Sequence, residues 1–389
     1  MHIALQRIAE SIFASGAFSG LAYYLMGIWT GARFLRKRRS LARLPRPSSM
    51  PPLSVLKPVR GTDPGAYESF RSHCLQDYPE YEIIFAVGDA DDPAVPLIEQ
   101  LQREFPARSI RLAICSQVRG MNRKVGKLVQ ILPQARYDYL LINDGDVRVP
   151  PDYLRRVMAA FSDERVGMVT CLYRGTAAGT LGSKLEALGI NTDFAAGVLV
   201  AQQLEDGLRF GLGATLAVSR EALQAIGGFE PMVDYLADDY ELGARMAAKG
   251  YKVALSDVIV EVFVPEYSFA RFFEHQLRWG RSTRNSRKVG YAGLILTFGS
   301  LWALLTVIAS GGAPIAWLVF GLALVARLTM AVTVGAGVLR AREVLRELWL
   351  VPLRDLVAFA VWVGSYTGRT VAWRGTYFIL EDGKLRPAA

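Results

Sequence analysis

The chain has 389 residues and a formal net charge of +9, and 51% of its residues are hydrophobic. This length suffices for two domains, and so apolar a composition is unusual for a soluble protein, so we expect membrane segments. The positive charge suits an anionic lipid surface or a polyanionic substrate, and we expect no nucleic-acid partner. Cys74, Cys115 and Cys171 lack metal-ligand spacing, which argues against a disulfide scaffold or zinc site and favours a reducing compartment.

The first predicted element is an apolar segment over residues 12–34, which is long enough to span a bilayer. A basic run follows it, whereas a signal peptide has its positive charge before the apolar stretch. We therefore expect a transmembrane anchor within residues 1–34, with the amino terminus outside and the basic flank in the cytoplasm. Residues 35–52 are predicted to form a basic, proline-rich linker.

Residues 53–288 have the composition of a soluble domain, in which short β-rich runs alternate with helical stretches. The predicted strands are 53–59, 81–89, 110–115, 139–144 and 166–174, and the clearest helices are 92–105 and 221–229. Strands that alternate with helices predict an α/β fold with a mostly parallel sheet and helices on both of its faces.

The apolar character returns in a carboxy-terminal membrane region over residues 289–368, which a tail over 369–389 follows. Segments 291–309 and 313–339 are each long enough to span the bilayer. A third segment, 348–366, contains Arg354 and Asp355, and a full crossing would export the basic tail against the inside-positive rule. It either spans or forms a re-entrant or interfacial helix, so we predict two or three helices in this region.

Two carboxylates one residue apart, Asp144 and Asp146, end the apolar run LLINDGDVRV. They would lie at the carboxyl end of a buried strand, where ligands bind in open α/β sheets. Such acids repel each other unless a cation or a shared proton intervenes. A divalent ion held by carboxylates and substrate phosphates is one solution, and an ordinary strand-to-turn exit is the alternative.

Three more charged clusters occupy residues 88–94, 234–251 and 272–288. Each has a simple structural explanation: an acidic helix start, ordinary helix capping, and a basic amphipathic helix on a lipid surface. A carboxylate at a helix start beside a pocket could also serve as a general base. In the last cluster, Arg278 offers a fork for phosphate oxygens with the flat ring of Trp279 beside it.

Taken in order, the LKP run, the DDPA acid, the D-x-D pair, the D-D-Y acid and the RW pair resemble the motifs of processive and lipid-directed GT-A glycosyltransferases. The chain most closely resembles the ceramide glucosyltransferase family (glycosyltransferase family 21, related to family 2), including bacterial relatives associated with hopanoid lipids. The resemblance covers about residues 53–285. It implies a GT-A nucleotide-sugar-binding domain with transmembrane helices at both ends.

The resemblance also implies roles for individual residues. Asp239 matches the catalytic base, and Asp144 with Asp146 would hold Mg²⁺ or Mn²⁺. The residues implied at the nucleotide sugar are Lys57, Asp92, Asn122, Lys124, Asp144 and Arg278. Those implied at the acceptor are Gly211, Gly213, His275, Gln276 and Trp279. Eukaryotic members need not have an acid where this chain has Asp146.

Three of these assignments have alternatives. The family motif has Gln or Arg three residues before the arginine, where this chain has His275, and Gln276 is one position off. Residues 120–128 could equally be a basic helix start, and the glycine-bearing stretch 210–219 could be a strand with a bulge.

The implied function is the transfer of glucose or N-acetylglucosamine from a UDP-sugar to a hydroxyl of a membrane lipid, ceramide or a hopanoid polyol, with inversion at the sugar. The expected location is the bacterial inner membrane, with the catalytic domain in the cytoplasm. One alternative is a processive polysaccharide synthase, although three or four spanning segments are few for a polymer channel. The other is a membrane-anchored nucleotide-sugar-binding protein without turnover.

Overall fold

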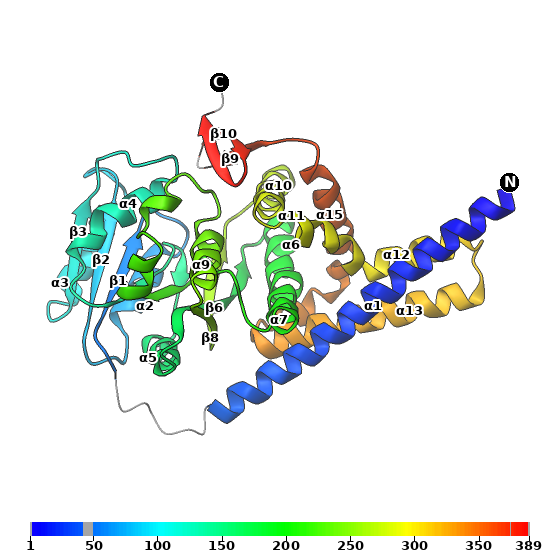
Figure 1. Ribbon diagram of the computed structural model, residues 1–389, viewed down its shortest axis with the longest axis horizontal. Coiled ribbons are helices and arrows are strands. Elements are labelled where there is room, and N and C mark those ends of the chain that lie inside the picture. Colours follow the sequence, from blue (N-terminus) through cyan, green and yellow to red (C-terminus); the bar gives the residue numbers. More distant parts are fainter. Residues whose placement is uncertain (1, 42–49, 374, 388–389) are drawn as a thin grey trace. The chain divides into compact units, whose positions relative to one another are not determined.

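The computed structural model describes residues 2–41, 50–373 and 375–387, which fall into two compact units (Figure 1). The first unit comprises Met1–Ala42, Ala177–Leu204 and Glu266–Tyr377, and the second comprises Arg43–Thr176, Glu205–Pro265 and Phe378–Ala389. The internal segment Ala177–Leu204 therefore groups with the terminal helices, although the sequence placed it inside the soluble domain.

The second unit is built on a sheet that has eight strands in the described part of the chain. The strands are β1 (Leu53–Pro58), β2 (Tyr81–Val87), β3 (Ser109–Ile114), β4 (Tyr139–Ile142), β5 (Val147–Arg148), β6 (Val166–Ala177), β7 (Leu216–Ser219) and β8 (Lys252–Val264). Their order across the sheet is β3-β2-β1-β4-β7-β6-β8-β5.

The predicted α/β fold is confirmed, and its sheet is mixed. β1 runs parallel to β2 and β4, and β2 runs parallel to β3. The helices α2 (Ala66–Cys74), α3 (Val95–Glu104) and α4 (Arg123–Ile131) make the crossovers that parallel strands require. β7 is antiparallel to β4 and β6, and β5 is antiparallel to β8. The carboxyl ends of β1, β2 and β4 consequently lie at one edge of the sheet.

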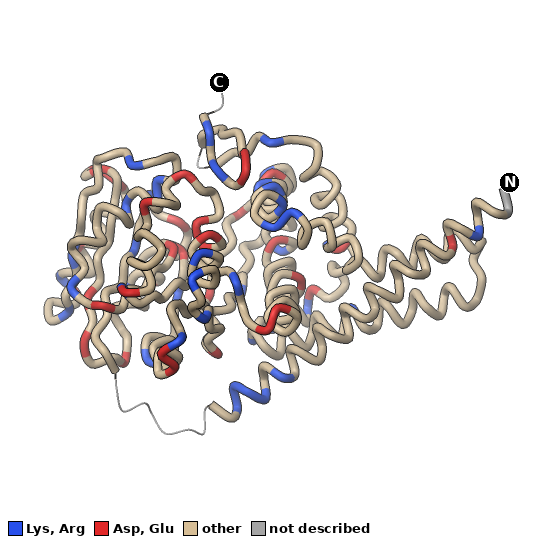
Figure 2. Tube along the Cα trace, viewed as in Figure 1, with Lys and Arg blue, Asp and Glu red and all other residues tan. Residues whose placement is uncertain are grey.

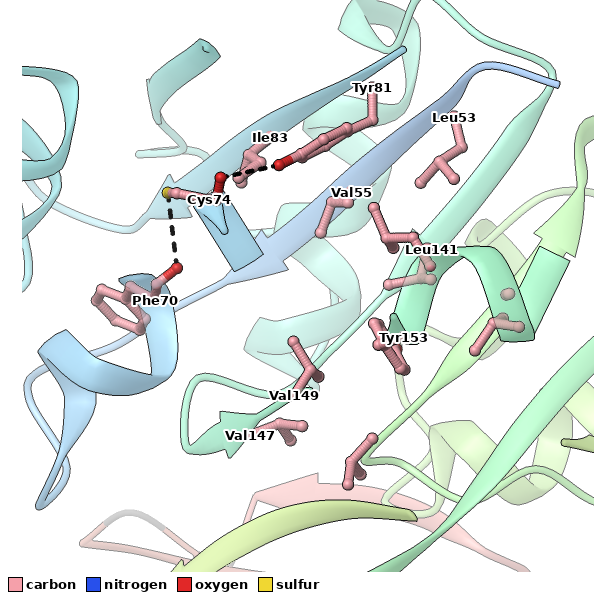
Figure 3. Packing of buried hydrophobic residues seen from close by; sticks show 14 of the residues in the cluster. Leu53, Val55, Phe70, Cys74, Tyr81, Ile83, Leu141, Val147, Val149 and Tyr153 are labelled. Atoms are coloured by element: carbon pink, nitrogen blue, oxygen red, sulfur yellow. Dashed lines mark hydrogen bonds between the residues drawn. The ribbon is translucent and has the colours of Figure 1, made fainter. Parts of the chain in front are cut away.

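Side chains of β1, β2, β4 and α2 form the core beneath this edge (Figure 3). Every residue of β1 and β2 is buried, as expected for strands covered on both faces. The Tyr81 hydroxyl donates a hydrogen bond of 3.0 Å to the carbonyl oxygen of Cys74, and the Cys74 thiol lies 3.7 Å from the carbonyl oxygen of Phe70. The Tyr81 hydrogen bond attaches α2 to the sheet, and the Cys74 contact lies within α2. All three cysteines are free and buried.

The first unit contains the long apolar helices. Its elements are α1 (His2–Leu41), α6 (Leu181–Gly189), α7 (Ala195–Leu204), α10 (Phe269–Ser286), α11 (Lys288–Gly293), α12 (Gly299–Ala309), α13 (Pro314–Ala331), α14 (Glu343–Arg346), α15 (Val351–Ser365) and the short strand β9 (Thr370–Trp373). α1 packs along α7, α12 and α13 (Figure 1). Gly20 and Gly299 let α1 and α12 touch backbone to backbone, because a Cβ on Gly20 would lie 2.1 Å from Gly299 Cα.

Three helices of the described residues are long and apolar enough to cross a membrane: Ala4–Leu41, Pro314–Val338 and Leu348–Ser365. The predicted segment 291–309 instead forms two helices, Lys288–Thr297 and Gly299–Ala309, that meet at 53° and could together make a fourth span. The chain leaves helical geometry at Phe298, between them.

The anchor helix is longer than the sequence predicted. α1 continues through the basic run to Leu41, so the first part of the predicted linker is helical and basic side chains gather at the carboxyl end of α1 (Figure 2). Arginine, lysine and leucine are good helix formers, which explains the extension. Residues 42–49 of the predicted linker lie outside the described residues.

The charges within the predicted segment 348–366 have protein partners. Asp355 accepts hydrogen bonds of 3.1 and 2.8 Å from the Arg327 guanidinium of α13, and Arg327 also pairs with Asp193. The Arg354 guanidinium donates to Gln276 Oε1 over 3.0 Å. Pairing of this kind is how ionisable groups are accommodated between membrane helices.

Candidate active site

The candidate site begins where β1 and β4 end in the second unit. Lys57 is fully buried in β1, and its ammonium donates a hydrogen bond of 3.0 Å to the carbonyl oxygen of Asp144. Burial lowers the pKa of Lys57 to about 7, although Asp146 and Asp144 oppose this effect. Lys57 therefore fixes the backbone at the end of β4.

Asn143 is a second buried support for this turn, and the sequence analysis did not single it out. Its amide nitrogen donates hydrogen bonds of 2.9 Å to the Tyr153 hydroxyl and 2.6 Å to the carbonyl oxygen of Ala214. Its side-chain oxygen lies 3.2 Å from His73 Nε2. Asn143 thus connects the turn that carries Asp144 to the loop before β7.

Asp144 and Asp239 border the same small space, which Gly213 leaves open. A Cβ on Gly213 would lie 3.2 Å from Asp144 Oδ2 and 3.2 Å from Asp239 Oδ2. The backbone nitrogen of Gly213 donates a hydrogen bond of 2.8 Å to the same oxygen of Asp239. The strand β7 begins only at Leu216, so residues 211–213 form a loop and not a bulged strand.

Asp239 lies in the first turn of α9 (Asp238–Ala248), where the free backbone N–H groups of a helix favour a carboxylate. Its Oδ1 accepts a hydrogen bond of 2.8 Å from the Tyr240 backbone. Burial and the neighbouring Asp238 raise the pKa of Asp239 to about 6, and Lys124 opposes the rise. Gly211 fixes the same turn, because its nitrogen donates to the Asp239 carbonyl over 3.1 Å. A carboxyl with this pKa is suited to accept a proton near neutral pH.

Lys124 is the cation of the site. Its ammonium lies 2.8 Å from Asp144 Oδ1 and 2.9 Å from Asp238 Oδ2. Burial alone would lower the pKa of Lys124, but the carboxylates of Asp144, Asp238 and Asp239 raise it above its usual range. Lys124 therefore stays charged and joins the turn after β4 to the start of α9.

Asn122 holds the loop that presents Lys124. Its side-chain oxygen caps α4 by accepting from the backbone nitrogens of Lys124 and Val125 over 3.0 and 3.2 Å. Its amide nitrogen donates to the carbonyl oxygen of Tyr235 over 2.7 Å and lies 3.3 Å from Asp238 Oδ1. Asn122 is fully buried, so these contacts indicate a positioning role.

Asp146 and Asp92 complete the predicted residues at this edge. Burial, with Asp144 and Asp63 nearby, raises the pKa of Asp146 to about 7. Asp92 Oδ1 accepts hydrogen bonds of 2.9 Å from the backbone nitrogens of Gly61 and Ala94, so it joins the loops after β1 and β2.

The predicted metal ligands, Asp144 and Asp146, lie one residue apart at the end of β4. No group of three or more His, Cys, Asp or Glu side chains is placed to hold a metal ion in the described part of the chain. Magnesium is commonly bound through one or two carboxylates with substrate phosphates and water as the other ligands. The crowded carboxyls of Asp144 and Asp146 fit an ion of that kind.

The remaining predicted residues belong to α10 of the first unit. His275 Nε2 lies 2.5 Å from an Arg278 guanidinium nitrogen, and the rings of His275 and Trp279 have centroids 5.1 Å apart. Gln276 is 6% exposed, and its side-chain oxygen is used by Arg354. The resemblance implied Gln276 at the acceptor, and in the structure its side chain joins α10 to α15.

A carboxy-terminal hairpin supports the loop that leads into α9. It consists of β10 (Thr376–Glu381) and β11 (Lys384–Pro387). Leu385 donates to the carbonyl oxygen of Asp234 over 2.7 Å, and Leu236 donates to that of Gly383 over 3.0 Å. The sequence pattern had indicated only a tail here.

Replacing Asn122 should destabilise the protein more than the loss of a helix cap alone. We expect Asn122→Ala to cost about 2–4 kcal/mol, because it removes a cap and leaves a buried carbonyl oxygen unpaired. The matched control is Ser219→Ala, which removes the N-cap of α8 (Arg220–Ala225), a single hydrogen bond from the Ala222 nitrogen. We expect this change to lower the free energy of unfolding by about 1 kcal/mol. Thermal denaturation of both full-length variants in detergent measures the difference, and equal losses would contradict the positioning role.

Comparisons with known proteins identify the family and relatives of this chain. The model of glycosyl transferase family 21 matches residues 12–386. Ceramide glucosyltransferase 3 of Caenorhabditis elegans is 26% identical over 233 residues, which are 60% of this chain and 50% of the worm protein. Beta-monoglucosyldiacylglycerol synthase of Synechocystis is 23% identical over 256 residues, which are 60% of this chain and 52% of that protein. The chain spans about half the length of these curated relatives.

A solved structure supports the fold. A mannosyltransferase from Pyrobaculum calidifontis, determined in complex with GDP-Man and Mn²⁺, superimposes with a TM-score of 0.52 at 18% sequence identity. The match covers 90% of this chain and 98% of the mannosyltransferase, so the second unit has the predicted GT-A type of fold. With the family model matched over nearly the whole chain, this protein belongs to glycosyl transferase family 21.

Proposed function

We propose that this protein is an inverting glycosyltransferase that moves a hexose from a UDP-sugar to a hydroxyl of a membrane lipid. The observation that carries the proposal is the arrangement of Asp144 and Asp239 on two sides of Gly213, with Lys124 beside both acids. A sugar nucleotide brings a charged diphosphate and an electrophilic carbon, and the acceptor brings a hydroxyl proton. Lys124 offers a cation for the diphosphate, and Asp239 offers a carboxylate base for the hydroxyl proton.

Asp239 is the proposed base. Two hydrogen bonds from backbone N–H groups hold its carboxylate at the start of α9, and they leave lone pairs free to accept the proton of an incoming hydroxyl. Attack by that hydroxyl on the face opposite the leaving diphosphate inverts the anomeric centre in one displacement. One base suffices for this reaction, whereas glycoside hydrolysis uses a pair of carboxylates.

Asp144, Asp146 and Lys124 form the proposed diphosphate end of the site. The ammonium of Lys124 can exchange a carboxylate partner for a phosphate oxygen without losing its charge. When bound, Mg²⁺ or Mn²⁺ held by Asp144 and Asp146 would supply positive charge to the departing diphosphate. Arg278 of the RW motif is proposed to contribute a further phosphate contact.

The lipid acceptor accounts for the apolar helices of the first unit. The relatives include proteins named for transfer to ceramide and to diacylglycerol, both of which stay in the bilayer. A domain attached to spanning helices can meet a lipid hydroxyl at the surface without extracting the lipid. We propose that the catalytic unit is cytoplasmic, on the bacterial inner membrane, where the UDP-sugar is supplied. Ceramide or a hopanoid polyol is the proposed acceptor.

Removal of the proposed base should abolish transfer without abolishing UDP binding. We expect Asp239→Asn to lower kcat by at least about 100-fold, because an amide cannot take up the hydroxyl proton. Transfer is measured by mass spectrometry of membrane lipids supplied with labelled UDP-glucose or UDP-N-acetylglucosamine, and UDP binding by calorimetry. Asp138→Asn is the control, because that side chain is 90% exposed. Unchanged turnover in Asp239→Asn would exclude Asp239 as the base.

The pH profile should report the raised pKa of Asp239. The base is active when ionised, so kcat/KM should fall about tenfold per pH unit below about 6. An ordinary aspartate would stay active to about pH 4. Lys124→Met removes the charge that lowers the pKa of Asp239, so the acidic limb should move to higher pH. If kcat/KM of the parent protein fell only below about pH 4, the assignment of Asp239 as the base would be contradicted.

A methyl group placed between the two acids should impair turnover more than folding. In Gly213→Ala the new Cβ would crowd Asp144 and Asp239, and a displacement of about 1 Å can cost roughly 100-fold in rate. Gly179→Ala is the matched control, since no atom lies within 4 Å of its new Cβ. Equal turnover and equal melting temperatures in the two variants would argue against a reacting group in this space.

A further inference from the structure

Three polar side chains of the first unit form a continuous chain of contacts that the family motif does not contain. Glu186 of α6 has its Oε2 atom 3.0 Å from His275 Nδ1. On the other side of the ring, His275 Nε2 lies 2.5 Å from a guanidinium nitrogen of Arg278. His275 and Arg278 belong to the motif found in the sequence, whereas no sequence pattern indicated Glu186.

The direction of the hydrogen bonds follows from the chemistry of the groups. A guanidinium can only donate, so His275 Nε2 must accept from Arg278. The proton of the ring is then on Nδ1, which donates to the Glu186 carboxylate. With Glu186 absent, only the donor of Arg278 would favour Nδ1 over Nε2 as the protonated atom. A proton on Nε2 would face the donors of Arg278.

The surroundings hold this chain of contacts in place. Glu186 is 4% exposed, and α6 packs against α10. The two helices approach so closely at Gly182 that an added Cβ would lie 3.1 Å from Phe272 Cβ of α10. The imidazole lies near the rings of Tyr267 and Trp279, whose centroids are 5.5 and 5.1 Å away. A buried carboxylate is costly unless it is paired, and here the Glu186 carboxylate is paired with the imidazole of His275.

We propose that Glu186 is a positioning residue that sets the tautomer of His275, and that His275 in turn orients the guanidinium of Arg278 toward a phosphate oxygen of a nucleoside diphosphate. In this chain, His275 with Glu186 would replace the Gln or Arg that the family motif has three residues before the arginine. The phosphate ligand of Arg278 rests on the proposed function, whereas the tautomer of His275 does not.

A double-mutant cycle tests the functional part. Glu186→Gln keeps the side-chain volume and removes the charge, and it should raise the KM for UDP-glucose and weaken UDP binding by about 10-fold, the usual size of such second-layer effects. A His275→Gln protein has no imidazole tautomer to set. In that background Glu186→Gln should change the KM for UDP-glucose and the affinity for UDP by less than about twofold. Glu274→Gln, an exposed neighbour on α10, should change neither value. An equal loss in both backgrounds would show that Glu186 has only a structural role and would overturn the proposal.

A spectroscopic measurement tests the tautomer without any activity. The chain has three histidines, so ¹⁵N-histidine labelling of the full-length protein gives few ring signals, and His275→Gln assigns those of His275. We expect a protonated Nδ1 in the parent protein and a shift toward protonated Nε2 in Glu186→Gln. A protonated Nε2 in the parent would refute the proposal, even if Glu186→Gln failed to fold. A protein with the expected tautomer but no sugar transfer would instead refute the proposed function.

Discussion

The candidate site depends on one buried electrostatic interaction, that of the Lys124 ammonium with the carboxylates of Asp144 and Asp238. Acids crowded at the end of β4 and the start of α9 would repel each other, and the lysine offsets that repulsion. The same charge opposes the rise in the pKa of Asp239. Loss of Lys124 would therefore affect both the arrangement of the acids and the ionisation of the proposed base. A bound diphosphate and cation would redistribute charge in this cluster, not introduce it into a neutral pocket.

Buried polar side chains hold Lys124 and the neighbouring acids in fixed positions. Lys57 and Asn143 fix the turn after β4, and Asn122 fixes the loop that carries Lys124. Most of their partners are backbone groups or neutral side chains, and Asn122 also contacts Asp238 Oδ1, so these residues hold the loops of the site in place. The first unit uses the same principle at a different place: Arg327 pairs with Asp193 and Asp355 between apolar helices, where an unpaired charge would be costly.

Much of the fold and of the site could be predicted because local patterns carry them. The parallel strands β1 to β4 are short β-rich runs, and the order of the acidic motifs indicated Asp144 and Asp239. Prediction was weaker where a residue matters through its neighbours. Asn143 and Glu186 are ordinary polar residues in the sequence, and only their buried partners give them a role. Gln276 matched a motif by type, yet its side chain is used by Arg354 of α15.

The sequence by itself determined the apolar segments, the alternation of strand and helix, and the acids at strand and helix ends, because hydrophobic periodicity and capping act over a few residues. Only the tertiary structure decided that Ala177–Leu204 groups with the terminal helices and that Gly213 separates two carboxylates. It also decided that the carboxy-terminal hairpin supports the loop before α9. Each of these joins segments that are far apart in the chain, and such pairings follow from how the whole molecule packs and not from any local preference.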